Sequence, residues 1–204
     1  MKFMYKTLVA ALLLVACSSA NKDVLPADFT PSPQRGIAVG TLTFEGDKPM
    51  NDIYRLFYNA VKGDKKFRKR NAGKIMIKAR EGNGRAFTGD FNNRKTYLFV
   101  IEREPGQYAF TEYNYLNHIG PNGMVNFSRE FAIPFDIKAG TISYIGEITY
   151  NDAALPGTPK LVVTDKMDRD VAEFGKKYPA VPWGMAVNNT AKSGDTAGGL
   201  VEFR

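Results

Sequence analysis

Short β-rich segments recur between residues 36 and 164, and they constrain the fold more than any other feature of the sequence. In residues 74–80, apolar and basic side chains alternate with the period of a strand that buries one face. Turn signals separate about seven or eight segments of this kind, and few segments read as helix. This pattern predicts a mainly β protein, folded as an antiparallel β-sandwich with one or two short helices.

Several segments allow more detailed expectations. Residues 95–104 are apolar on both faces, which predicts a central strand. The Pro-Gly pair in residues 104–107 is typical of a type II turn, so residues 95–115 are expected to form a β-hairpin. Pro134 predicts an edge strand or a break between two strands. In residues 141–150, the apolar even-numbered side chains are expected to share one face.

Two segments have the periodicity of a helix. Residues 170–178 place Val171 and Phe174 on one face, and Asp170 stands where an N-cap is expected. Residues 50–63 carry a weaker apolar stripe, which predicts a second helix.

The first residues of the chain have the pattern of an export signal. A short positive region precedes an apolar run of about ten residues, which is too short to span a bilayer but suits the core of a signal peptide. The sequence Leu14-Val15-Ala16-Cys17 resembles the lipobox of bacterial lipoproteins. The resemblance implies cleavage before Cys17 and a diacylglycerol on its thiol. An ordinary secretory signal with a chance cysteine is the alternative.

The lipobox resemblance sets the expected organisation of the chain. Residues 1–16 are the signal peptide, residues 17–35 are the lipidated cysteine with a proline-containing flexible tether, and residues 36–204 are the β-sandwich domain. Ser18 follows the cysteine, where inner-membrane retention signals carry Asp. We therefore expect a protein anchored by lipid in the outer membrane and facing the periplasm, with the membrane as its first partner.

The order of segments resembles a recurrent family pattern. The sequence "YLFVIEREPGQYAFTEYNY" is followed by "FAIPFDIKAGTISYIGEITY", and together they resemble the transthyretin-like or PEGA-like sandwiches of bacterial lipoproteins. The resemblance implies the fold only, because no catalytic residues can be carried over from those proteins.

The charge of the chain bears on its partners. The formal net charge is +7, and it falls to +5 when Lys2 and Lys6 leave with the signal peptide. A basic exported domain meets anionic lipid, lipopolysaccharide or cell-wall polymer, so we expect no nucleic-acid partner. The alternative is that the charge serves solubility alone.

Residues 62–74 form a dense basic segment with one acidic residue, Asp64. One interpretation is a solvated loop or frayed helix end, and the other is contact with the phosphates of lipid or lipopolysaccharide, or with an acidic protein. Phe67 within this segment could insert into such a surface. The candidate residues for binding an anionic ligand are Lys62, Lys65, Lys66, Arg68, Lys69, Arg70 and Lys74.

Candidate catalytic and metal-binding residues are few. His118 is the only histidine, so metal sites that need two histidines are excluded, and we expect it in an ordinary loop. Asp165, Asp168 and Asp170 lack the spacing of an EF-hand and are expected to cap a helix. The glycines of residues 82–89 fit a hairpin turn better than a phosphate-binding loop. We expect no catalytic residue, metal or cofactor.

Aromatic residues are frequent in the β segments, and two roles are open to them. In strands that alternate they form core, whereas an exposed row would suit sugar binding. The residues concerned are Tyr97, Phe99, Tyr108, Phe110, Tyr113, Tyr115, Tyr144 and Tyr150.

Together these features predict a non-catalytic envelope lipoprotein that binds or scaffolds another component. The alternative is a module that binds glycan or lipopolysaccharide through residues 62–74, and an envelope hydrolase ranks third. A buried acidic pair in a cleft would favour the hydrolase.

Overall fold

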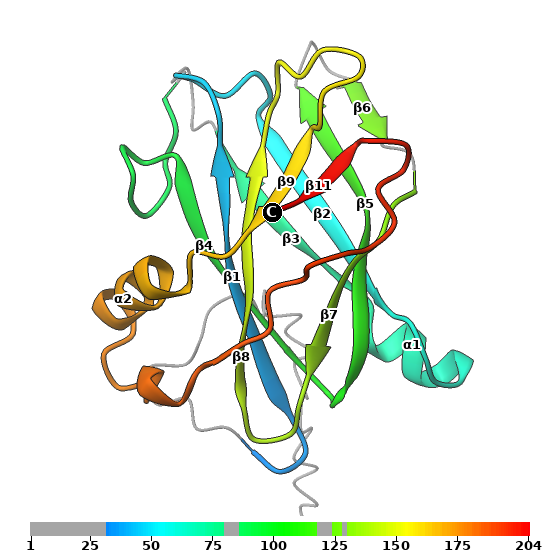
Figure 1. The fold of residues 1–204 in the computed structure, drawn as a ribbon, viewed down its shortest axis with the longest axis vertical. Coiled ribbons are helices and arrows are strands. Elements are labelled where there is room, and N and C mark those ends of the chain that lie inside the picture. The colour runs from blue at the N-terminus through cyan, green and yellow to red at the C-terminus, as the bar shows by residue number, and fades with distance from the viewer. Residues whose placement is uncertain (1–31, 80–85, 118–123, 128–129) are drawn as a thin grey trace, which may run out of the picture.

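The computed structural model describes residues 32–79, 86–117, 124–127 and 130–204. It is mainly β, with two sheets packed face to face and short helices at the periphery (Figure 1). The mainly β class and the sandwich are therefore confirmed. Cys17, His118, Gly82 and Gly84 lie outside the described residues.

The first sheet has the strand order β11-β9-β8-β1-β4, and β10 also pairs with β8. Its strands are β1 (Gly36–Phe44), β4 (Thr96–Arg103), β8 (Ile142–Tyr150), β9 (Leu161–Thr164), β10 (Val187–Asn188) and β11 (Val201–Phe203).

The second sheet has the order β3-β2-β5-β6, and β7 pairs with β5. Its strands are β2 (Ile53–Ala60), β3 (Gly73–Lys78), β5 (Gly106–Asn117), β6 (Met124–Phe127) and β7 (Ile133–Ile137). Pro134 lies in β7, which pairs with β5 alone, so the prediction of an edge strand is confirmed.

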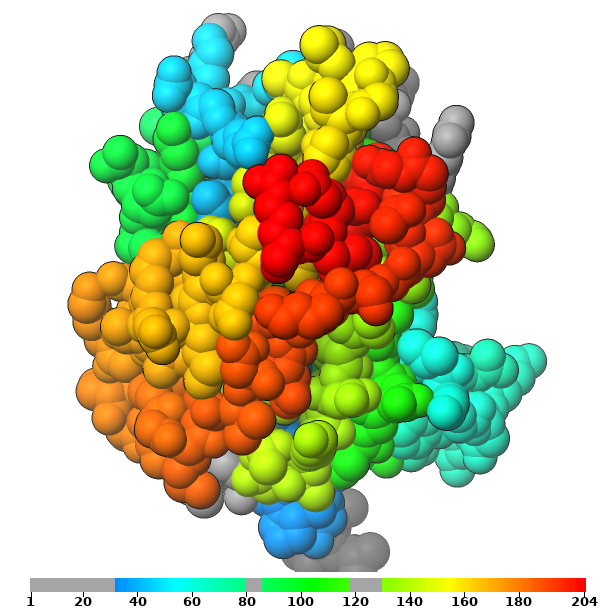
Figure 2. All heavy atoms as spheres, in the orientation of Figure 1, coloured from blue at the N-terminus to red at the C-terminus, as the bar shows by residue number. Residues whose placement is uncertain are grey.

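The helices lie at two separate places on the sandwich. α2 (Met167–Lys177) and the 3₁₀ turn η2 (Trp183–Met185) lie over the outer face of the first sheet, whereas α1 (Lys65–Asn71) projects from one end of the molecule (Figures 1 and 2). No helix in the described ranges is long and apolar enough to cross a membrane.

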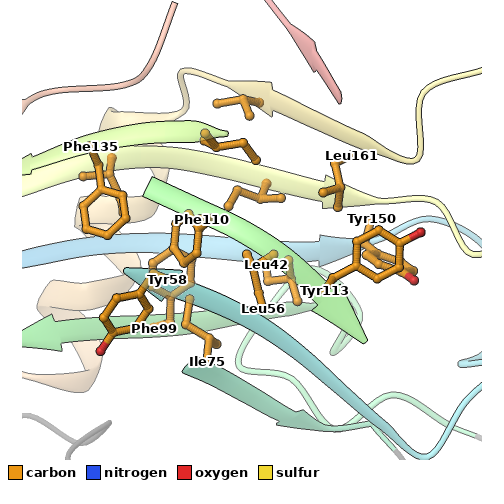
Figure 3. Close-up of a cluster of buried hydrophobic side chains, with 14 of the residues drawn as sticks. Leu42, Leu56, Tyr58, Ile75, Phe99, Phe110, Tyr113, Phe135, Tyr150 and Leu161 are labelled. Carbon is orange, nitrogen blue, oxygen red and sulfur yellow. The ribbon is translucent and has the colours of Figure 1, made fainter. Parts of the chain in front are cut away.

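The main core lies between the two sheets and is rich in aromatic rings (Figure 3). Phe99 of the first sheet meets Phe110 of the second edge to face, with ring centroids 6.1 Å apart. Tyr150 of the first sheet similarly contacts Tyr54 and Tyr113 of the second. A smaller apolar cluster lies on the outer face of the first sheet, where Phe174 and Trp183 cover Ile37 and Tyr144.

The expectation of antiparallel pairing throughout is wrong for the first sheet. The second sheet is antiparallel, but β1 and β8 run parallel, and so do β9 and β11. Parallel neighbours need a long connection between them, and here the whole second sheet lies in the sequence between β1 and β8.

The predicted hairpin of residues 95–115 is also wrong. β4 pairs with β1 in one sheet, and β5 pairs with β2 in the other, so the Pro105-Gly106 pair carries the chain between sheets. Gly106 is not among the glycines with positive φ, which a type II turn would require. β4 is an edge strand rather than a central one, and it is buried on both faces because the smaller apolar cluster covers its outer side.

The helix predicted for residues 50–63 is a strand. In β2 the buried side chains are Tyr54, Leu56, Tyr58 and Ala60, which alternate with more exposed ones. The segment contains both a period of two and an approximate helical stripe, and pairing with β3 and β5 selects the former.

The side chains of β8 do not keep to one face as expected. Ile142 and Tyr144 point to the outer cluster, whereas Ile148 and Tyr150 belong to the core between the sheets. Gly146 has φ of 104°, and the register with β1 shifts beside it. This bulge exchanges the two faces of the strand, and it turns Glu147 to the outer side.

Candidate functional site

α1 is a short helix that lies within the basic segment of residues 62–74. The Asp64 carboxylate caps it by accepting a hydrogen bond of 2.7 Å from the Phe67 amide. The prediction of a loop or frayed helix end is therefore corrected, because Asp64 supplies the acceptor that the first turn lacks. The one acidic residue of the segment thus has a structural role.

Phe67 anchors this helix to the sandwich. Its ring is partly buried against the main core, and Gly63, with φ of 109°, has no room for a Cβ beside it. The expectation that Phe67 could insert into another surface is wrong, since the ring already packs inward.

The basic side chains of the segment differ in their surroundings. Arg70 forms an ion pair with Glu104, and Lys74 lies over the Phe57 ring at 5.9 Å. The remaining five are exposed, and none of them forms an ion pair with any residue in the described ranges. They are Lys62, Lys65, Lys66, Arg68 and Lys69. The helix and Lys62 before it thus present to solvent five positive charges that have no ion-pair partner among the described residues.

Asn71 joins the end of α1 to the start of the connection between β4 and β5. It is buried, donates to the Phe67 carbonyl and Glu104 carboxylate, and accepts from the Glu104 amide. Hydrogen bonds from Arg70 hold the pKa of Glu104 below its ordinary value, so this carboxylate stays charged. The base of the helix is therefore fixed to the sandwich.

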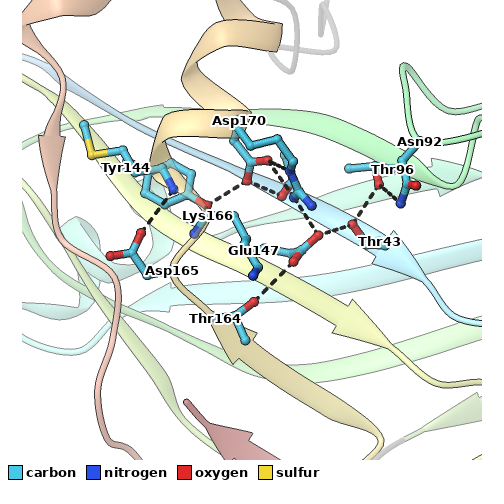
Figure 4. Close-up of polar contacts among 12 residues, drawn as sticks. Thr43, Asn92, Thr96, Tyr144, Glu147, Thr164, Asp165, Lys166 and Asp170 are labelled. Atoms are coloured by element: carbon cyan, nitrogen blue, oxygen red, sulfur yellow. Dashed lines mark hydrogen bonds and ion pairs between the residues drawn. The ribbon is translucent and has the colours of Figure 1, made fainter.

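A separate polar cluster lies beneath α2, on the outer face of the first sheet (Figure 4). Arg169 bridges two buried carboxylates, with 2.7 Å to Glu147 and 2.7 Å to Asp170. Thr41 and Tyr144 also donate to Asp170, each at 2.7 Å.

Glu147 is satisfied in the same way as Asp170. Thr43 donates to one of its oxygens and Thr164 to the other. Burial disfavours the charged form of Glu147, but these hydrogen bonds and that of Arg169 outweigh it and lower its pKa. Burial raises the pKa of Asp170, and its hydrogen bonds offset part of that effect.

Chemically, this cluster fastens α2 to the sheet. Each carboxylate oxygen of Glu147 and Asp170 has a donor, and Arg169 forms an ion pair with both carboxylates. These two residues are therefore not a pair of free acids in an open cleft. An ion pair placed between a helix and a sheet is a structural contact of the kind that costs most when one partner is removed.

Sequence reasoning missed this cluster because it placed Asp170 at the helix N-cap. α2 begins at Met167, three residues earlier, so Asp170 lies in the first turn and points inward. Asp165 does accept from the Met167 amide as a cap would, and Asp168 is exposed. The signal for an inward Asp170 was its helical spacing from Phe174, which shares its buried face.

The aromatic residues of the strands belong to the interior. Of the eight named above, Tyr115 is half-buried and the other seven are buried, so the core interpretation is confirmed for them. These eight residues do not form an exposed row for stacking on sugars.

Comparison with known proteins adds little to this geometry. No protein-family model and no curated protein matches the sequence. Among solved structures, the chain is similar to a leucine-rich repeat protein from Bacteroides thetaiotaomicron, with a TM-score of 0.31 and 11% identity. That similarity covers 62% of this chain and 15% of the other, and no conclusion about fold or function rests on it.

Proposed function

We propose that this protein is a lipid-anchored, non-catalytic binding module of the bacterial envelope. It is anchored through Cys17 in the outer membrane, and it contacts an anionic envelope component through the basic segment of residues 62–74. The lipobox resemblance supports the anchor, and the exposed charges of α1 support the contact.

One observation carries the binding proposal. Five exposed cations that pair with no acidic residue in the described ranges lie on the helix that projects from the sandwich or, for Lys62, just before it (Figure 2), while Asp64 is occupied as a cap. Basic side chains near an anionic surface each contribute about 1 kcal/mol, and a protruding helix can bring several of them to that surface at once. A phosphate-bearing lipid or glycan suits this surface by charge.

Co-purification from detergent-solubilised envelopes tests this proposal. In the test variant, Lys62, Lys65, Lys66, Arg68 and Lys69 become Gln, and Arg70 is kept because it holds Glu104. The control variant loses the same charge at five exposed residues elsewhere, namely Lys48, Lys78, Arg94, Lys166 and Lys192.

The proposal expects lipopolysaccharide or another anionic component to come down with wild type and with the control, and to be lost from the test variant. Equal recovery with all three proteins would contradict it and would leave α1 as a solvated helix. Equal loss from both variants would also contradict it, because net charge alone would then explain binding.

A further inference from the structure

Two further arginines lie beside the base of α1. Arg35 immediately precedes β1, Arg103 ends β4, and the strand register places Gly36 directly opposite Arg103. Together with Arg70 they line a surface pocket of about 550 Å³, which is completed by Gln34, Asn71 and Glu104. The sequence did not single out Arg35 or Arg103, because they are distant from the basic segment along the chain.

The charges around this pocket do not cancel. Arg70 is paired with Glu104, and Arg35 lies 3.1 Å from Glu102. Arg103 donates to the Glu102 backbone carbonyl at 2.7 Å, but it forms no ion pair within the described part of the chain. One guanidinium charge is therefore left without a counter-charge at the pocket wall.

One buried donor is also left over. The Nε atom of Arg103 is buried and has no hydrogen-bond acceptor in the described part of the chain, whereas the Nε atom of Arg35 lies 3.1 Å from the Glu102 carboxylate. Buried donors without acceptors are uncommon in folded proteins, because an unmade hydrogen bond forfeits the solvation of the donor. Three arginines beside two carboxylates at one pocket suit an oxyanion, which presents several acceptors to arginine forks.

The position of Arg103 is fixed by its packing. Its guanidinium lies over the Tyr58 ring at 5.3 Å, and a Cβ on Gly73 would come within 2.7 Å of its Nη2. The hydrogen bonds of Asn71 hold the adjoining wall. A guanidinium held in place before binding loses less conformational entropy when it meets a ligand.

We infer that this pocket binds a phosphate group, with Arg35 and Arg103 as its principal ligands. The inference rests on the proposed function and adds to it a defined binding pocket for the anion. A phosphate has enough oxygens to accept from both guanidinium groups, whereas a carboxylate has two oxygens and a single charge. The unpaired cations of α1 attract the ligand toward this end of the molecule.

Titration with soluble phosphates tests the pocket directly. The mature chain carries Cys17→Ala, so that it keeps its length but cannot be lipidated, and it is titrated with inorganic phosphate and glucose 1-phosphate by calorimetry or NMR. Glucose serves as the uncharged probe. We expect saturable binding of both phosphates and none of glucose.

Substitutions then locate the site. Arg35→Gln and Arg103→Gln are each expected to weaken phosphate binding about tenfold or more, as loss of a hydrogen bond to a charged group does. Arg103→Lys restores the charge but not the fork, so it recovers only part of the affinity. Arg94→Gln, an exposed arginine just before the opposite end of β4, removes the same charge and is expected to have no effect.

Vesicles identify the source of the phosphate. Binding of the same variants is measured to phosphatidylcholine vesicles with and without phosphatidic acid. Loss of binding in Arg103→Gln points to a lipid headgroup, and unchanged vesicle binding with lost glucose 1-phosphate binding points to a phosphorylated glycan. Either result supports the pocket.

The inference and the proposed function fail separately. If wild type binds no phosphate, or if Arg35→Gln and Arg103→Gln bind glucose 1-phosphate as wild type does, the pocket inference is wrong. If the α1 variant retains its envelope partner as wild type does, the proposed function is wrong even where the pocket binds phosphate as expected. Thermal unfolding of each variant identifies misfolded protein, and Arg35, with 36% of its side chain exposed, provides the variant that disturbs packing least.

Discussion

At the scale of single residues, Arg169 holds together the polar cluster beneath α2. It forms ion pairs with two carboxylates that belong to different elements, Asp170 in α2 and Glu147 in β8, and its guanidinium also lies over the Phe91 ring at 5.3 Å. Because both carboxylates are buried and Arg169 carries a single positive charge, the loss of Arg169 would leave two buried carboxylates without a cation. The attachment of α2 to the sandwich therefore depends on the ion pairs of Arg169.

Asp170→Asn tests this dependence. The substitution keeps the shape of the side chain, but it turns an amide NH2 toward groups that donate to Asp170, either Thr41 and Tyr144 or Arg169. We therefore expect the free energy of unfolding to fall by about 1–3 kcal/mol. Urea unfolding measures it. Asp168→Asn, an exposed change on the same turn, is the matched control and is expected to stay within about 0.5 kcal/mol of wild type. Similar values for the two variants would show that the cluster contributes little.

The pH dependence of stability separates the two carboxylates. The pKa of Glu147 is lowered by folding, so its contribution is present above its unfolded pKa of about 4.3 and is lost as pH falls through the lower folded value. The pKa of Asp170 is raised, so its contribution is present below its unfolded pKa of about 3.9 and is lost as pH rises.

Glu147→Gln should therefore be most destabilising near neutral pH. Urea unfolding of wild type and variant between about pH 6 and about pH 3 is expected to show a difference that shrinks as the pH falls. A difference that grows on acidification would mean that the folded state does not hold Glu147 as the charged partner of Arg169.

At the scale of elements, periodicity predicted the character of segments better than their pairing. Residues 74–80 and 141–150 both contain the strands that their alternating side chains predicted. The pairing of β4 and β5 was not predictable in the same way, because a Pro-Gly connection is compatible with a hairpin and with a crossing between sheets. Only the contacts of distant residues decide between these two.

The candidate site was predictable in part for the same reason. The basic segment is contiguous in the sequence, so its charge is visible without a structure. Arg35 and Arg103 meet only through the pairing of β1 with β4, and Glu147 meets Asp170 only through the bulge at Gly146. Sites assembled by long-range pairing leave little trace in local sequence.

Gly146→Ala tests the bulge. Its φ of 104° strains any other residue, and a Cβ would lie 2.9 Å from Thr190 Cγ2, so we expect a loss of about 1–3 kcal/mol in unfolding free energy. Gly184→Ala, where a Cβ meets nothing within 4 Å, is the control and is expected to change stability little. Equal effects would argue that Gly146 is not required for the exchange of faces in β8.

At the scale of the whole molecule, we propose a lipid anchor at Cys17 and a basic binding surface on the domain. Mass spectrometry of protein purified from bacterial membranes is expected to find a diacylglycerol-modified N-terminal Cys17, and Cys17→Ser is expected to release the protein from the membrane fraction. An unmodified cysteine in the mature protein would contradict the anchor. It would leave the surface of α1 to be tested by itself.

The most direct measurement of the central claim is the sedimentation of the unlipidated mature chain with anionic phospholipid vesicles over a range of salt concentrations. We predict that the chain binds, that salt weakens the binding, and that the five-Gln α1 variant binds more weakly by about a thousandfold or more, at about 1 kcal/mol per charge. The control variant with five charges removed elsewhere should bind much like wild type. If the two variants bind alike, α1 is not the surface that meets the envelope.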